Sequence, residues 1–223
     1  PKPTCFQNLM AGLWYDLFDF EKKSTKSNLS QNQLEFSDRI RRFNKIEQLT
    51  SIFSNRNRSF EELKLGYLSP TRDITDSTVR ELACSVIRIL GEKKRIKELP
   101  SKYPLTDSFP MAVRKLVQQV YNIHSRAETN ERLDALRDLL RDCGIIDRQV
   151  TVLTGEGISF VKSDIGSKYW VCPRCKTIHM HHANGICINC FHKLDKECVL
   201  TKEDITNPND FYLSLLNSTD NVY

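Results

Sequence analysis

Two Cys-x-x-Cys pairs constrain the fold of this chain more than any other sequence feature. They are Cys172-Pro-Arg-Cys175 and Cys187-Ile-Asn-Cys190, with eleven residues between them. A tight turn lets both thiolates of one pair converge on a single ion, and two pairs complete a tetrahedral zinc site. The spacer is somewhat shorter than in the common zinc pattern but of the same type. We therefore predict one zinc ion, the cofactor of this chain, held by Cys172, Cys175, Cys187 and Cys190.

Four thiolates leave no open coordination position, so we expect a structural metal whose binding and local folding are one event. Two alternatives stay open: four unrelated buried thiols, and a Cys-x-x-Cys redox pair, for which tandem pairs are not typical. Histidines crowd the same segment, and one of them could replace a thiolate; the simpler interpretation makes them solvated or hydrogen-bonding side chains. They are His179, His181, His182 and His192.

Composition indicates a soluble globular protein. The 223 residues suit one large domain or two small ones, with 39% hydrophobic and 27% charged residues. No apolar run approaches the length of a membrane span, and no signal peptide is visible. We therefore expect no membrane partner. The cysteines outside the two pairs follow no secreted-type disulfide framework, so we expect a reducing cytoplasm. These are Cys5, Cys84, Cys143 and Cys198.

The chain opens Pro1-Lys2-Pro3 without an initiator Met. We expect it to be part of a longer polypeptide. A net charge of +5 permits a polyanionic partner without requiring one.

Apolar residues recur every three to four positions, which predicts helices over residues 6–18, 33–53, 76–90, 110–121 and 130–142. Asp76 or Thr78 can cap the third of these, and Thr78-x-x-Glu81 fits a capping box. Gly91 is a plausible terminator of that helix. The apolar face of the helix predicted over residues 6–18 can pack on the chain's own core or in a groove of a partner protein. The side chains that we expect to be buried are Leu13, Trp14, Ile40, Leu82, Val86 and Leu116.

After residue 148 the helical period gives way to alternation. Residues 149–153 and 158–161 flank Thr154-Gly155-Glu156-Gly157, which predicts a β-hairpin. Three helices and a hairpin follow the order of a winged helix, over residues 76–163. Many helical bundles also end in a hairpin, and the second helix lacks a clear array of outward Arg, Asn or Gln. The fold class is therefore mainly α (α+β), with a helical region 1–148, a zinc ribbon 164–200 and a tail 201–223.

The segment Lys168–Cys190 resembles a ribbon in large bacterial superfamily 2 helicases of anti-phage defence systems, of the Druantia and DISARM type. The resemblance covers roughly the last sixty residues, and Asn209–Leu213 is similar to the aromatic segment that follows the ribbon there. The matching residues besides the cysteines are Trp170, His179, His181 and Gly185.

Two departures from these families matter. Lys176 and Phe191 occupy positions where a zinc knuckle often has Gly, which predicts some distortion of the turns. The chain also has no Gly-x-x-x-x-Gly-Lys-Ser/Thr motif and no Asp-Glu-x-His box. The ATP-hydrolysing motor lobes are therefore not in this sequence.

The resemblance implies an accessory, nucleic-acid-binding segment of an ATP-dependent DNA helicase or translocase in antiviral defence. Its partners would be DNA, other subunits of a defence complex, or the motor lobes of the same polypeptide. Positive charge beside aromatic rings suits a nucleic-acid strand, so Arg174, Lys176, Lys168 and Trp170 are the candidate contacts. Trp170 packed under the knuckle as core is the alternative for that side chain.

No catalytic centre is expected in this chain. His124 stands alone on a helix, and the histidines of the ribbon lack the partner of a metal-dependent nuclease. The alternative function is a zinc-stabilised protein–protein interaction module that docks a partner subunit and makes no contact with nucleic acid.

Overall fold

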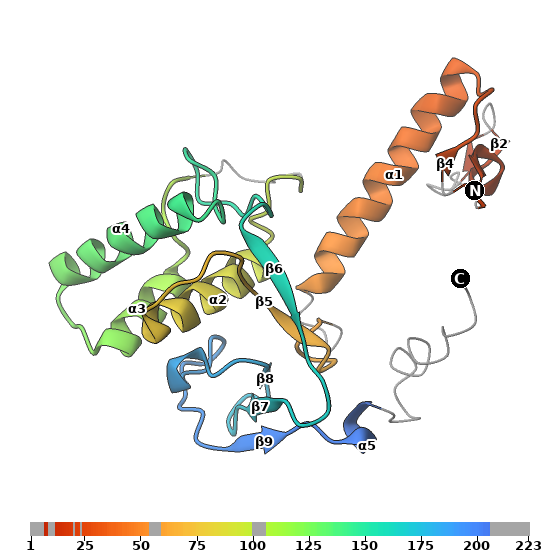
Figure 1. Cartoon of the computed structure of the whole chain (residues 1–223). Helices are drawn as coiled ribbons and strands as arrows, with labels where there is room; N and C mark the ends of the chain where they lie inside the picture. The colour runs from red at the N-terminus through yellow and green to blue at the C-terminus, as the bar shows by residue number, and fades with distance from the viewer. Residues whose placement is uncertain are drawn as a thin grey trace. The chain divides into compact units, whose positions relative to one another are not determined.

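The computed structural model describes residues 7–8, 12–19, 21–22, 24–53, 59–99 and 106–205 (Figure 1). The chain divides into two compact units, Pro1–Leu49 and Thr50–Tyr223. No described helix is long and apolar enough to cross a membrane. The aromatic segment Asn209–Leu213 lies outside the described residues.

The first unit contains two very short strand pairs and most of one long helix. Strands β1 (Gln7–Asn8) and β2 (Gly12–Leu13) pair, as do β3 (Phe18–Asp19) and β4 (Ser24–Thr25). The 3-10 helix η1 (Trp14–Leu17) lies between them, and α1 (Gln31–Ile52) follows. The core joins η1 to α1 through Leu17, Phe36 and Ile40.

The helix predicted over residues 6–18 is wrong for residues 12–18. Leu13 and Trp14, which we expected to be buried, are 38% and 36% exposed, whereas Leu17 is fully buried. A short apolar stretch does not distinguish a helix from strands by period alone, and Gly12 disfavours a helix here. Phe6, Leu9 and Met10 lie outside the described residues. The second predicted helix is confirmed as α1, with Ile40 buried.

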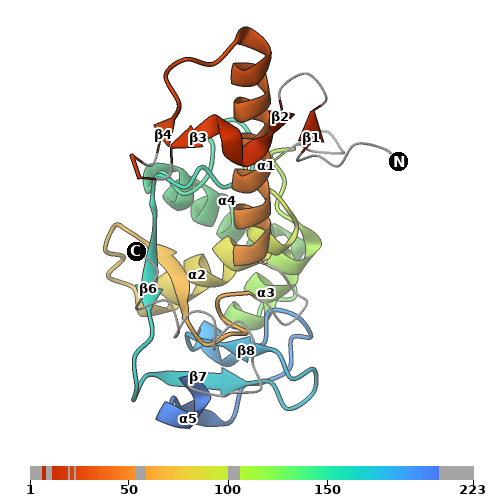
Figure 2. The ribbon, with the colours of Figure 1, turned by 90° about the vertical axis from the view of Figure 1, so that its right-hand side faces the viewer.

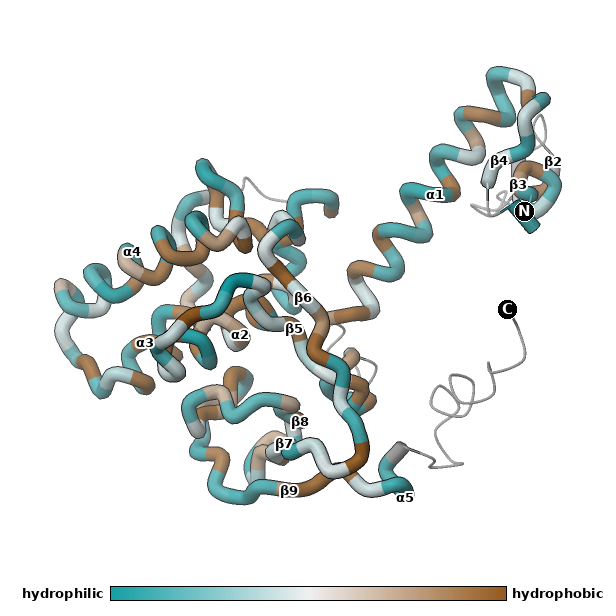
Figure 3. The backbone as a smooth tube through the Cα atoms, in the orientation of Figure 1, coloured by the Kyte–Doolittle hydropathy of each residue, from teal (hydrophilic) through white to brown (hydrophobic). Residues whose placement is uncertain are grey.

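Three helices form the core of the second unit: α2 (Ser77–Glu92), α3 (Met111–Tyr121) and α4 (Arg126–Asp142). Asp76 is the N-cap of α2, and its carboxylate accepts bonds from the backbone N–H of Thr78 and Val79. Gly91 lies inside α2, where a Cβ would collide with the Phe53 ring. The expected burial is confirmed for Leu82, Val86 and Leu116. Figure 3 shows hydrophobic and hydrophilic residues alternating along α4.

The predicted hairpin is wrong in its pairing. Strand β6 (Ile158–Lys162) pairs antiparallel with β5 (Gly66–Pro70), a strand that lies outside every element predicted from the sequence. Leu153 makes only isolated bridges, antiparallel to Ile146 and parallel to Ile96. The predicted turn, residues 154–157, is bonded instead to the segment that follows α4. Thr154 N–H donates to Ile145 O, and Gly157 N–H donates to Gly144 O, each at 3.0 Å.

The ribbon follows β6 and contains a small three-stranded sheet. Its strands β7 (Lys168–Val171), β8 (Ile178–His179) and β9 (Glu197–Val199) have the antiparallel order β8-β7-β9. The 3-10 helix η2 (Ala183–Gly185) lies between β8 and β9, and the short helix α5 (Lys202–Ile205) ends the described chain. The ribbon lies beneath α2 and α3 in Figures 1 and 2. The fold is therefore α+β, with helices and small antiparallel sheets.

Candidate metal centre

The four cysteines of the two pairs come together at one point of the ribbon. Their four sulfur atoms all lie within 4.8 Å of one another. The Cys172 and Cys190 sulfurs are 3.4 Å apart, and those of Cys175 and Cys187 are 3.5 Å apart. Tetrahedral zinc with bonds of about 2.3 Å requires sulfur–sulfur separations of about 3.8 Å. The cluster therefore fits a metal ion such as zinc with little adjustment.

Both cysteine pairs close through the same turn. Lys176 N–H donates to Cys172 O, and Phe191 N–H donates to Cys187 O, each at 2.9 Å. Lys176 and Phe191 have φ values of 63° and 58°, so both are left-handed. The two turns therefore have the same conformation although neither has Gly at this position. Holding a non-Gly residue in the left-handed region costs of order 1 kcal/mol of stability at each turn.

The thiols of the cluster are held in unequal environments. Burial would raise the pKa of Cys175, but hydrogen bonds from the Thr177 hydroxyl, the Thr177 backbone and neighbouring thiols lower it to about 6. Burial raises the pKa of Cys187 well above its ordinary value. Without a cation the cluster therefore favours a mixture of thiol and thiolate. A bound divalent ion favours the thiolate form of all four, so metal binding releases protons.

His179 contacts the cysteine cluster through the sulfur of Cys187. Its side chain is fully buried, and its Nε2 lies 3.4 Å from the Cys187 sulfur. Burial holds the pKa of His179 well below its ordinary range, so the ring is neutral and can donate one N–H to the sulfur. His182 and His192 are exposed, and the cluster of potential ligands contains the four cysteines without a histidine.

Side chains from outside the ribbon bind the free edge of strand β8. Glu62 accepts a bond from Ile178 N–H at 3.4 Å, and Arg88 donates to Ile178 O at 2.7 Å. Glu61 accepts a bond from Met180 N–H at 3.0 Å. Because every one of these backbone groups has a partner, the edge of the ribbon is held firmly against the helical part of the second unit.

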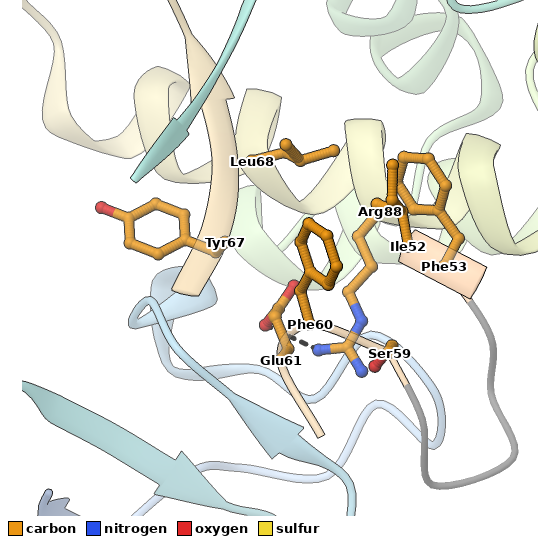
Figure 4. A pocket seen from close by; sticks show the side chains of 8 residues that line it. All are labelled: Ile52, Phe53, Ser59, Phe60, Glu61, Tyr67, Leu68 and Arg88. Carbon is orange, nitrogen blue, oxygen red and sulfur yellow. Dashed lines mark hydrogen bonds and ion pairs between the residues drawn. The ribbon is translucent and has the colours of Figure 1, made fainter. Parts of the chain in front are cut away.

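Arg88 is the centre of this contact. Its side chain is 7% exposed and makes ion pairs with Glu61 at 2.7 Å, Glu92 at 3.0 Å and Glu62 at 3.5 Å. Figure 4 shows the guanidinium of Arg88 reaching Glu61 beside Phe60. The hollow lined by these side chains measures about 20 Å³, which is room for one water molecule rather than for a substrate.

A second contact lies at the other end of α2. The Glu81 carboxylate accepts bonds from His181 Nδ1 and from Ala183 N–H, each at 2.8 Å. Asn184 Nδ2 donates to Thr78 O at 3.0 Å. Burial would raise the pKa of Glu81, but the hydrogen bond and charge of His181 lower it. Glu81 therefore anchors η2 instead of serving in a capping box.

Sequence reasoning missed both contacts. Glu81 and Arg88 are seven residues apart and so share one face of α2. The available signal was Arg88 itself, a charge within an otherwise apolar stretch of helix, where an arginine needs a buried partner.

The predicted nucleic-acid contacts fall into two groups. Arg174 and Lys176 lie on the first knuckle, are exposed, and make no ion pair within the described part of the chain. Lys168, on β7, pairs with Glu197 at 3.0 Å. Trp170 is half-buried against the cysteine cluster, with its ring edge-to-face on His182 at 5.3 Å. A stacking role for Trp170 stays a prediction.

Comparison of the chain with protein-family models, with curated protein sequences and with solved structures finds no significant match.

Proposed function

We propose that this chain is an accessory, zinc-stabilised segment that binds nucleic acid through the phosphate backbone. The observation that carries this proposal is the exposed pair Arg174 and Lys176 on the first knuckle. Neither has an acidic partner among the described residues, so both are available to phosphate. Meanwhile β8 and η2 are bound to the helical part, which holds the knuckle in a fixed place. A rigid, unpaired cation pair suits backbone contact more than sequence reading.

Zinc is the ion that the donor set favours. Thiolates are soft ligands, and four of them in a closed tetrahedral arrangement suit zinc better than magnesium, calcium or manganese. The ion would order the two knuckles and would take no part in chemistry. The residues that would hold it are Cys172, Cys175, Cys187 and Cys190.

The helices α2 to α4 supply a second surface to consider. A short connection over residues 122–125 joins α3 to α4, and the bridges at Ile96, Ile146 and Leu153 suggest a much reduced wing. Helix α4 carries four arginines and five acidic residues. Asp107 already pairs with both Arg137 and Arg141. These charges disfavour insertion of α4 into DNA, so we place the nucleic-acid contact on the ribbon.

The larger context rests on the motif resemblance. We propose that the segment belongs to an ATP-dependent DNA helicase or translocase of bacterial anti-phage defence, whose motor lobes or partner subunits would supply ATP hydrolysis. Motor motifs in the encoding open reading frame or an adjacent one would support this placement, and an operon without them would count against it.

The second candidate function is a docking module without nucleic-acid contact. The observation that favours it is the ribbon itself, whose backbone groups and His181 already bind polar side chains of another segment of protein. Such a contact needs no phosphate, and its affinity would depend little on salt.

The charge reversal Arg174→Glu with Lys176→Glu separates the two. We expect weaker binding of short single-stranded and duplex DNA by the intact chain, with unchanged zinc content. Two lost phosphate contacts should lower the slope of log K against log salt by about two. The matched control is Arg126→Glu with Arg148→Glu, two exposed arginines without ion pairs among the described residues. Equal DNA binding by the ribbon variant and wild type at low and high salt would favour the docking module.

A further inference from the structure

Strand β6 has an outer edge whose backbone groups can be assigned from the hydrogen-bond pattern. Thr71 N–H donates to Gly157 O, and Ser163 N–H donates to Leu65 O, each at 2.9 Å. In an antiparallel pair, bonded residues alternate with residues that direct their groups to the other side. Within β6 the residues bonded to β5 are therefore 159 and 161. Ile158, Phe160 and Lys162 direct their N–H and C=O groups away from β5.

The opposite side of this two-stranded sheet is blocked. Helix α2 packs against β5, and Pro70, which occupies the outer position of β5, has no N–H to donate. No backbone hydrogen bond joins the outward groups of Ile158, Phe160 or Lys162 to another described residue. Within the described chain, β6 is the edge of this sheet that remains open to another strand.

Phe160 gives this edge an apolar centre. Its ring covers Gly66, where a Cβ would lie 2.8 Å from the ring, and meets Phe60 edge-to-face at 5.1 Å. Even so, Phe160 is 44% exposed. A large aromatic side chain in the middle of an unpaired edge is the feature that natural sheets usually avoid or cover.

We propose that β6 of a second copy of this chain covers this edge, in an antiparallel pair centred on Phe160. In that register Phe160 lies opposite Phe160 of the other copy, and Ile158 lies opposite Lys162. Each of the three residues donates one bond and accepts one bond, so all six outward N–H groups are satisfied. The result is a four-stranded sheet, β5-β6 followed by β6-β5 of the second copy.

The choice of a second copy rests on this self-complementarity. When the pair is centred on Phe160, each of the three outward residues of one copy lies opposite an outward residue of the other copy. A shift of the register by two residues leaves one outward residue of each copy without a partner. A shift of one residue directs the backbone groups to the wrong side. The register also keeps the Lys162 side chains of the two copies apart and places the aromatic rings together, a favourable cross-strand pair. A contact this short is expected to be weak, below the roughly 1,200 Å² typical of stable interfaces.

Sedimentation equilibrium of the intact chain, up to about 0.5 mM, tests the pairing at the affinity expected of a weak interface. Wild type should show a reversible dimer. Phe160→Glu and Phe160→Lys should each weaken dimerisation at least about tenfold, because like charges would face each other directly. An equimolar mixture of the two variants should dimerise again, which a misfolded variant could not do. Ile165→Glu, at a residue 64% exposed outside the strand, is the control and should dimerise like wild type.

Two results would overturn this assignment. One is a wild-type chain that stays monomeric over the whole concentration range. The other is a Phe160→Glu variant that dimerises as wild type does, which would place the interface elsewhere. Neither outcome bears on DNA binding by Arg174 and Lys176, which lie on the ribbon.

Discussion

Replacing Arg88 with Met should weaken the contact between the ribbon and α2 and destabilise the second unit. The guanidinium is 7% exposed and lies 2.7 to 3.5 Å from three carboxylates, on Glu61, Glu62 and Glu92. Removing one partner of a buried ion pair typically costs about 3–5 kcal/mol, because the remaining charge is left uncompensated. For a unit of this size, each kcal/mol lowers Tm by about 2–4 °C, so the expected loss is about 6–20 °C.

The same variant should respond to pH in a defined direction. Burial already raises the pKa of Glu62 and of Glu92 despite the presence of Arg88. A carboxyl whose pKa is higher in the folded than in the unfolded state destabilises the fold when ionised. That penalty is present above the folded pKa and disappears as pH falls below the unfolded one. Arg88→Met raises these pKa values further, so its loss of stability should be largest at neutral pH and shrink in acid.

The chain offers a local reporter for the measurement. It has two tryptophans, the exposed Trp14 of the first unit and Trp170 beside the cysteine cluster. In a Trp14→Phe background, thermal unfolding followed by fluorescence reports on the ribbon. Arg148→Met is the matched control, because Arg148 is exposed and has no ion pair within the described residues. A melting temperature for Arg88→Met within about 2 °C of that control would refute the buried-pair reasoning.

Further outcomes are expected at single positions. Cys175→Ser should lower zinc content and unfold residues 166–200 before the helices, as elemental analysis and hydrogen exchange would report; less than about half an equivalent of zinc in the native protein would contradict a zinc site. Leu82→Ala, at a residue 1% exposed, should cost about 2–5 kcal/mol in denaturant unfolding, and wild-type stability would mean that the assigned face is wrong. Lys176→Val should destabilise the first knuckle by about 1–2 kcal/mol and Lys176→Gly should stabilise it slightly, because φ of 63° is costly for every residue with a Cβ and most costly for a β-branched one. Equal chelator-induced zinc loss in the two variants would argue against the turn. The pKa of Glu81 is lowered, so its stabilisation should be lost as pH falls through that pKa, and Glu81→Gln should flatten the acid limb of the stability curve.

The features that could be predicted from the sequence are local ones. A Cys-x-x-Cys pair lies within one turn, so its ligands converge whatever the rest of the chain does. The apolar stripes of α2, α3 and α4 can also be predicted, because their buried residues recur with the helical period. These are Leu82 and Val86 in α2, Val113, Leu116 and Val117 in α3, and Leu133, Leu136 and Leu140 in α4.

The missed features join residues that are far apart in the chain. Glu61 reaches Met180 across 119 residues, and Glu81 reaches His181 across 100. Neither contact has a periodic signal, because a single carboxylate in a turn or a helix looks like any solvated charge until its partner is known. The predicted hairpin is wrong for a related reason. The alternation of apolar and polar residues in β6 indicates a strand, but it does not indicate which other strand pairs with it.

The pairing of β5 with β6 has a consequence for synthesis of the chain. Eighty-seven residues, 71–157, separate the two strands, and three helices lie within that interval. At about 5–20 residues per second, a ribosome takes roughly 4–17 s to produce them. During this time β5 has left the ribosome without its partner, while α2 to α4 have all the local contacts that they need to fold. We therefore expect the helices to fold first, then the β5–β6 sheet, and the metal-binding ribbon last. A stalled or truncated product ending before residue 158 would carry an unpaired β5, and it is this species that we expect chaperones or proteases to recognise.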